Sequence, residues 1–315
     1  MSRLRGDVFH WFDAGRVVPG AEREVLGAAG MVPTGREWRA FLGQLALWLG
    51  TLALAASVIF FFAFNWDDLG RFAKLGLVEG AIVTALLVFW RADLDGTAGK
   101  ALLLLLSLLV GALLALTGQI YQTGADTFEL FAYWALLILP WVLVGRFSPL
   151  WLLWLALLNL AAFFYWRIWL SGEALIWTMF GLNTLALVVW EAAHRAGLSW
   201  LRDSWPPRLT ALASGTMATI LIISAIIDPD ADGPLAAAAY LAWLAALYYW
   251  YRSVRPDLFM LAGGVLSAIV AVATFLSWQI LDSGSGGLLL IGLVVIGMSG
   301  GGALWLQRIA REQPA

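Results

Sequence analysis

The chain has no cysteine and only two histidines, His10 and His194. The lack of cysteine excludes disulfides, thiolate metal sites and cysteine nucleophiles. The sequence also contains no HExxH pattern, no Walker loop and no Cys/His metal cluster, which excludes the common zinc-hydrolase and nucleotide-binding sites. We therefore expect no catalytic residues of a familiar type, no cofactor and no metal, and the sequence favours a non-enzymatic protein.

Charged residues are scarce. They make up 13% of the chain, against 62% hydrophobic residues, and a soluble domain could not cover its surface with so few polar groups. The 19 Trp residues agree with this, because the indole ring collects at membrane interfaces. A net charge of -2 gives no reason to expect nucleic acid. The partner that the composition indicates is the lipid bilayer.

Apolar runs divide the chain into membrane-spanning segments of about 20 residues, the length that crosses a hydrocarbon core of ~30 Å. The sequence predicts an all-α, polytopic helical membrane protein of about ten such segments. They are 41–64, 72–90, 101–122, 127–145, 149–166, 173–191, 208–227, 235–251, 258–279 and 286–307.

The distribution of positive charge predicts the orientation of these segments. With the N-terminus inside, only Arg71, Lys74 and Arg167 of the 19 Lys and Arg residues fall on the outer side, as the positive-inside rule requires. This predicts both termini in the cytoplasm. Residues 1–36 are then a small cytoplasmic helical segment, and residues 37–315 form the ten-helix transmembrane domain. Thr34 and Glu37 form a capping-box pattern that would start the first membrane helix.

Polar residues gather where the first and third membrane segments end, and the predicted topology brings both ends to the outer face. The second segment runs between them and carries Glu79, the one acidic residue placed well within a span. These residues form the candidate polar site: Asn65, Trp66, Asp67, Glu79, Gln119, Tyr121, Gln122 and Asp126.

Glu79 has two interpretations. A carboxylate within a span is costly, so it should face protein or water. It could be a protonated group hydrogen-bonded across a tight helix pair, since Gly76, Gly80 and Thr84 recur at four-residue spacing. Alternatively it could be a proton- or ion-linked carboxyl in a transport pathway. Near the C-terminus, the spacing of Gly297 and Gly301 likewise predicts close helix packing.

Two stretches resemble a known family. They are "GREWRAFLGQLALWLGTLALAASVIFFFAFNWDDLGRFAKLGLVEG" and "TGQIYQTGADTFELFAYWALLILPW". The resemblance is to the bacterial membrane proteins catalogued as domain of unknown function 2157, and it is strongest from about Met31 to Trp141. The residues that carry it are Trp38, Phe41, Asn65, Trp66, Arg71, Gly118, Gln119, Tyr121, Gln122, Thr123, Gly124, Ala125 and Asp126. It implies a multi-pass protein of the bacterial cytoplasmic (inner) membrane, often encoded beside other small membrane proteins, and it supplies no catalytic residues.

Three functions remain open from the sequence. The first is a non-enzymatic subunit of a membrane or envelope complex, with other small membrane proteins as partners. The second is a proton- or ion-coupled secondary transporter or channel, with Glu79 and the rim from Gln119 to Asp126 in the pathway. A membrane enzyme acting on lipid-linked substrates comes third, because the sequence offers no nucleophile–base pair.

Overall fold

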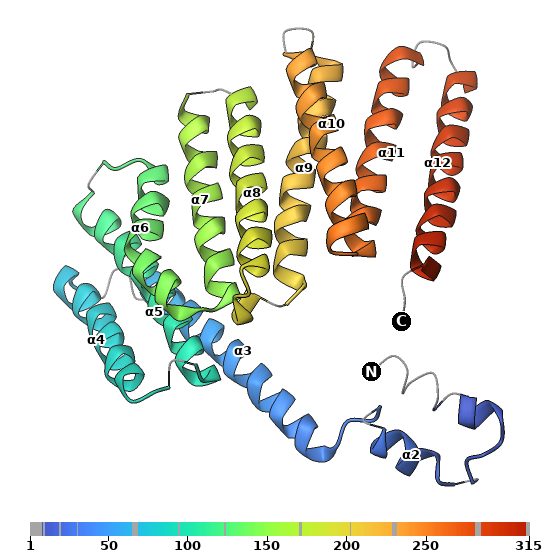
Figure 1. The fold of residues 1–315 in the computed structure, drawn as a ribbon. Coiled ribbons are helices and arrows are strands. Elements are labelled where there is room, and N and C mark those ends of the chain that lie inside the picture. The colour runs from blue at the N-terminus through green and yellow to red at the C-terminus, as the bar shows by residue number, and fades with distance from the viewer. Residues whose placement is uncertain are drawn as a thin grey trace. The chain divides into compact units, whose positions relative to one another are not determined.

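The structure is a computed structural model of the chain. It describes residues 8, 10–18, 20–29, 31–64, 69–93, 95–122, 124–169, 172–201, 203–228, 232–280 and 285–312. These residues form helices and no strand, and all ten predicted segments are helical (Figure 1). The helices are α2 Glu22–Ala28, α3 Gly35–Phe64, α4 Arg71–Trp90, α5 Thr97–Tyr121, α6 Thr127–Gly145, α7 Ser148–Ile168, α8 Gly172–Arg195, α9 Trp205–Ile227, α10 Gly233–Tyr249, α11 Leu258–Ile280 and α12 Ser285–Glu312.

The helix ends follow from local chemistry. The predicted capping box is confirmed at the start of α3: the Thr34 backbone N–H donates to Glu37 Oε2 at 2.6 Å, and the Glu37 N–H donates to Thr34 Oγ1 at 3.3 Å. Proline stands in the first turns of α7, α9 and α10, where its missing N–H costs nothing. Pro140 lies inside α6, and the helix continues past it.

Nine helices of the described chain are long and apolar enough to cross a membrane. The remaining segment is α10, an α-helix of 17 residues. It continues without a break into a π-helical turn, η2, Trp250–Val254. The added turn lengthens this helix beyond its α-helical part and places Trp250 and Tyr251 at its end.

The chain forms two compact units, Met1–Leu116 and Thr117–Gln313, and the boundary falls within α5. In the first unit, α4 buries Lys74, Val78 and Ala85. The same unit contains α2, α3 and most of α5, and α5 buries much of its length. The sequence divides the chain at residue 36 into a cytoplasmic segment and a transmembrane domain. This division stays a prediction.

In the second unit, consecutive helices pack side by side from α6 to α9, and α9 also contacts both α10 and α11 (Figure 1). The last helix, α12, packs on α11. Tyr240, Trp243, Leu247 and Leu261 are buried in the core of this unit. Small residues set the helix separations, because a Cβ at Gly215 would lie 2.9 Å from Trp243 Cη2.

The close packing predicted at Gly297 and Gly301 is wrong. A Cβ at either position would meet no described atom within 4 Å. The close contact of α12 is made one residue later, since a Cβ at Gly302 would lie 2.6 Å from Val265 Cγ1 of α11. One residue turns the helix face by about 100°, so the sequence pattern identified the right helix and the wrong face.

Candidate functional site

The predicted polar site is distributed over both compact units. Asn65, Trp66 and Asp67 lie outside the described residues. Glu79 lies in α4 of the first unit. The residues Gln119, Tyr121, Gln122 and Asp126 belong to the second unit.

In the second unit, the predicted rim is a surface turn between α5 and α6. Gln119, Tyr121, Gln122 and Asp126 are all exposed. The chain reverses through two left-handed residues, with φ of 45° at Gln122 and 67° at Gly124. Asp126 is extended at the N-cap position of α6, and its side chain makes no cap hydrogen bond there. The four polar side chains of this turn therefore point away from the core of the second unit.

In the first unit, Glu79 is exposed and Lys74 is buried. Five residues separate them, which is about 140° around an α-helix, so the two charged side chains lie on different faces of α4. Thr84 donates to the Gly80 carbonyl of its own helix at 2.7 Å. A Cβ at Gly76 or Gly80 would meet no described atom within 4 Å. The predicted tight helix pair is therefore not formed at these glycines within the described chain.

Sequence reasoning missed a buried carboxylate. Glu191 is 5% exposed, at the end of α8. Its carboxylate accepts from Tyr251 OH at 2.9 Å and from Trp250 Nε1 at 3.2 Å. Arg255 Nη1 donates to both oxygens, at 3.1 and 3.2 Å. The carboxylate is thus both neutralised and hydrogen-bonded, the condition under which a buried charge is tolerated.

The π-helical turn η2 supplies two of these donors, because Trp250 and Tyr251 are its first residues. The turn also places Trp250 beneath Arg195, whose guanidinium carbon lies 4.2 Å from the indole ring. Single π-helical turns often occur at functional sites. Here η2 fixes the end of α10 onto α8 through a charged centre.

A second ion pair joins α9 to the start of α11. Arg208 donates from Nε and Nη2 to Asp257 at 3.0 and 3.2 Å. Asp257 also accepts from the Phe259 backbone N–H at 2.9 Å, which caps α11. The signal for both pairs was present in the sequence. The positive-inside rule places Arg208 and Arg255 on the inner side, and Glu191 and Asp257 lie at the inner ends of predicted spans.

Polar side chains deeper in the second unit bind one another across helices. Asn159 of α7 and Asn183 of α8 exchange amide hydrogen bonds of 2.7 and 3.2 Å. Ser214 of α9 bonds to Thr184 at 2.7 Å and accepts from Trp243 Nε1 at 2.9 Å. Such bonds hold membrane helices together. Among the described residues, no group of three or more His, Asp or Glu side chains could hold a metal ion.

Comparison with known families gives one match. Residues 9–151 match the predicted membrane protein family DUF2157. The resemblance expected from the sequence is confirmed, and the match extends further in both directions than the stretch from Met31 to Trp141. No curated protein and no solved structure matches the chain. With its apolar helices, the match shows a multi-pass membrane protein.

The DUF2157 match covers every residue of the predicted polar site, from Asn65 to Asp126. It ends in the first turn of α7. The carboxylate centre at Glu191 and the Arg208–Asp257 pair therefore lie in the part of the chain beyond the family match.

Proposed function

We propose that this protein is a non-enzymatic subunit of a membrane complex and that it binds its partner within the bilayer through α4. The observation that carries the proposal is the exposed carboxyl of Glu79 on an apolar, membrane-length helix. Glu79 lies eight residues after Arg71, a rise of about 12 Å, which is well inside a hydrocarbon core of ~30 Å.

A carboxyl at this depth needs a polar neighbour, because contact with lipid tails costs several kcal/mol. Its helical neighbours do not supply one. Val83, one turn further along α4, is 54% exposed, and Leu86 is 41% exposed. An exposed polar group set in an apolar helix face is a feature of interhelical recognition in membranes. A helix of the partner would therefore place a hydrogen-bonding side chain opposite Glu79.

The interior of the second unit favours a subunit over a transporter. Its membrane-embedded polar side chains are bonded in pairs, such as Asn159 with Asn183. A transport pathway needs polar groups that can exchange one partner for another, whereas these side chains lock neighbouring helices together. The proposed complex lies in the bacterial inner membrane, with both termini of this chain in the cytoplasm and other small membrane proteins as partners. The charge bias of the sequence supports this orientation.

The proposal is tested by photo-crosslinking from Val83, with a photoreactive residue placed on the face that follows Glu79. We expect a crosslink to a second polypeptide in native membranes, identified by mass spectrometry. The matched control is Val188 of α8, which is 59% exposed and should crosslink only to lipid. A crosslink from Val83 solely to another part of the same chain would contradict the proposal.

Substitution then tests the carboxyl itself. Glu79→Leu should abolish recovery of the partner in mild detergent, and Glu79→Gln, which keeps the hydrogen-bonding groups, should retain most of it. Glu173→Leu is the control, because Glu173 is an exposed carboxyl in the first turn of α8. Equal partner recovery from all three variants would exclude Glu79 as the contact.

A further inference from the structure

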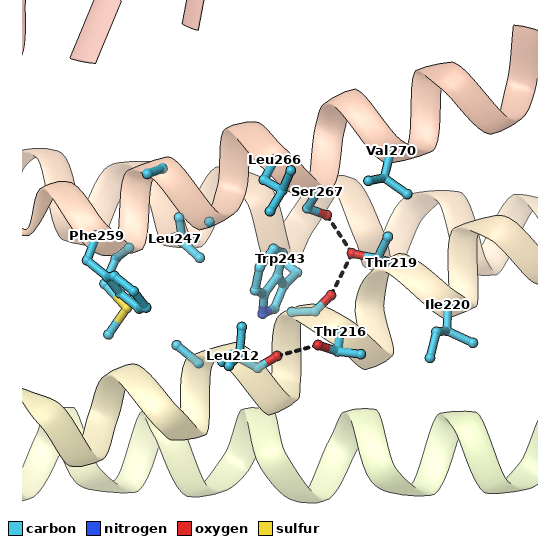
Figure 2. Close-up of a pocket in the computed structure, with 15 residues that line it drawn as sticks. Leu212, Thr216, Thr219, Ile220, Trp243, Leu247, Phe259, Leu266, Ser267 and Val270 are labelled. Carbon is cyan, nitrogen blue, oxygen red and sulfur yellow. Dashed lines mark hydrogen bonds between the residues drawn. The ribbon is translucent and has the colours of Figure 1, made fainter. Parts of the chain in front are cut away.

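A groove of about 440 Å³ runs along the second unit between α9 and α11 (Figure 2). Trp243 of α10 forms its floor, and Leu212, Ile220, Leu266 and Val270 line its sides. Both walls belong to helices that are long and apolar enough to span the membrane. The groove is therefore open to hydrocarbon rather than to water.

The hydroxyl groups along the groove are occupied. Thr216 donates to the Leu212 carbonyl at 2.8 Å (Figure 2). Thr219 donates to the Gly215 carbonyl at 2.7 Å and lies 2.7 Å from Ser267 Oγ. The groove consequently offers an occupant methyl and methylene surface and no free hydrogen-bonding group that would favour a polar ligand.

The groove is about as long as the hydrocarbon part of one leaflet is thick. On α11 it extends from Phe259 to Val270, a rise of roughly 16 Å at 1.5 Å per residue. On α9 it extends from Ala211 to Ile220, a rise of roughly 14 Å. Both distances are close to half of a ~30 Å hydrocarbon core. A transmembrane helix of a partner would need a contact along the whole thickness, whereas an acyl chain of a single leaflet needs half of it.

An ion-paired guanidinium, that of Arg208, lies at the membrane-surface end of the groove. The Arg208 guanidinium carbon lies 5.4 Å from the ring centre of Phe259, which lines the groove. Arg208 is held in place by Asp257 through Nε and Nη2, and its side chain remains 39% exposed. Nη1 takes no part in this pair. A planar guanidinium with outward N–H groups is suited to a phosphate.

We propose that the groove binds one anionic phospholipid of the leaflet at the Arg208 end, with an acyl chain along α9 and α11 and its phosphate at Arg208. The chain fills the apolar groove, and the headgroup adds charge complementarity. This inference is independent of the partner proposed at Glu79, because the groove lies wholly within the second unit.

The test begins with native mass spectrometry of the full chain, released from membranes in mild detergent. We expect one retained phospholipid per chain. Gly263→Phe should reduce the retained lipid by tenfold or more, because Gly263 lines the groove and a Cβ there meets open space. Gly297→Phe is the matched control, since Gly297 is also an exposed helical glycine with open space around it, on α12. It should retain the lipid.

A second measurement uses the protein without substitutions, so that misfolding of a variant cannot affect its result. The chain is reconstituted in nanodiscs that contain phosphatidylglycerol with a photoreactive group near the end of one acyl chain. We expect the crosslinked peptide to contain Leu266 or Val270. Labelling spread evenly over the lipid-facing helices would overturn the proposal, as would absence of label from the groove, the result expected if a second copy of the chain covers it.

The headgroup contact is tested by lipid preference. Arg208→Gln combined with Asp257→Asn removes the cation without leaving an unpaired carboxylate. We expect the preference for phosphatidylglycerol over diacylglycerol, which has no phosphate, to fall about fivefold, because the guanidinium N–H donors to the phosphate are lost. Arg208→Lys should keep the preference. Arg252→Gln is the control, because Arg252 pairs with Glu312 away from the groove. An unchanged preference in the double variant would overturn the phosphate contact.

Discussion

Of the three side chains that donate to Glu191, Arg255 alone supplies a positive charge. The Glu191 side chain is 6% exposed and its ion pair with Arg255 spans 3.1 Å. Removing Arg255 leaves a carboxylate that has lost its neutralising charge, which typically costs about 3–5 kcal/mol. We therefore expect Arg255→Met to lower the unfolding midpoint strongly, as followed by circular dichroism in detergent. Arg255→Met combined with Glu191→Gln should recover much of the loss.

The matched control for this ion pair is Arg252 with Glu312. It joins the π-helical turn to the end of α12, but Glu312 is 58% exposed. Exposed pairs contribute about 0–1 kcal/mol, so Arg252→Met should change the midpoint little. Equal effects of Arg252→Met and Arg255→Met would show that burial of Glu191 does not govern its contribution to stability.

Two adjacent glycines in α12 give a second prediction at the residue scale. Gly302 packs against Val265, whose branched side chain is stiff. Gly302→Ala should therefore destabilise the contact of α11 with α12 by about 1–3 kcal/mol, the usual cost of overpacking. Gly301→Ala meets open space and should be neutral or slightly stabilising, because Ala favours helix over Gly. Thermal unfolding of the two variants measures the difference, and the reverse order would contradict this packing.

At the scale of the element, the π-helical turn decides whether α10 crosses the membrane. Its α-helical part has 17 residues, a rise of about 25 Å, and is short for a ~30 Å core. With η2 the helix reaches Val254, and we propose that the combined element spans. Asp232→Cys and Ser253→Cys should then react with an impermeant thiol reagent from opposite sides. The chain has no native cysteine, so each label reports one site. Reaction of both from the same side would exclude crossing by α10.

Helices could be predicted from sequence because length and apolarity are local properties. The segment 127–145 coincides with α6, and the prediction for 258–279 differs from α11 by one residue. The π-helical turn could not be predicted, because Trp250 and Tyr251 continue the aromatic run of α10 without a break. The positive-inside rule assigns Glu191 and Arg255 to the same side of the membrane, but their pairing joins residues of separate helices and therefore depends on tertiary packing. The contact of Gly302 with Val265 also depends on tertiary packing. Gly302 follows the predicted Gly301 directly and lies on a different face of α12.

At the scale of the whole molecule, the orientation in the membrane rests on the distribution of Lys and Arg. The ends of α8 test it most directly, because Glu173 and Ala196 are both exposed and stand at its two ends. In intact cells we expect Glu173→Cys to react with an impermeant thiol reagent and Ala196→Cys to be protected until the membrane is opened. Arg195, Arg208 and Arg255 would then lie on the cytoplasmic side, as the positive-inside rule requires.

The same experiment locates the lipid site. Arg208 marks the surface end of the groove, so a cytoplasmic Ala196 would place the proposed phospholipid in the inner leaflet, whose anionic lipids attract basic residues. The reverse labelling pattern would invert the predicted topology and assign the groove to the outer leaflet. Phosphatidylglycerol confined to one face of reconstituted vesicles then distinguishes the two orientations, because only lipid in the leaflet at the Arg208 end can bring its phosphate to the guanidinium while its acyl chain lies along α9 and α11.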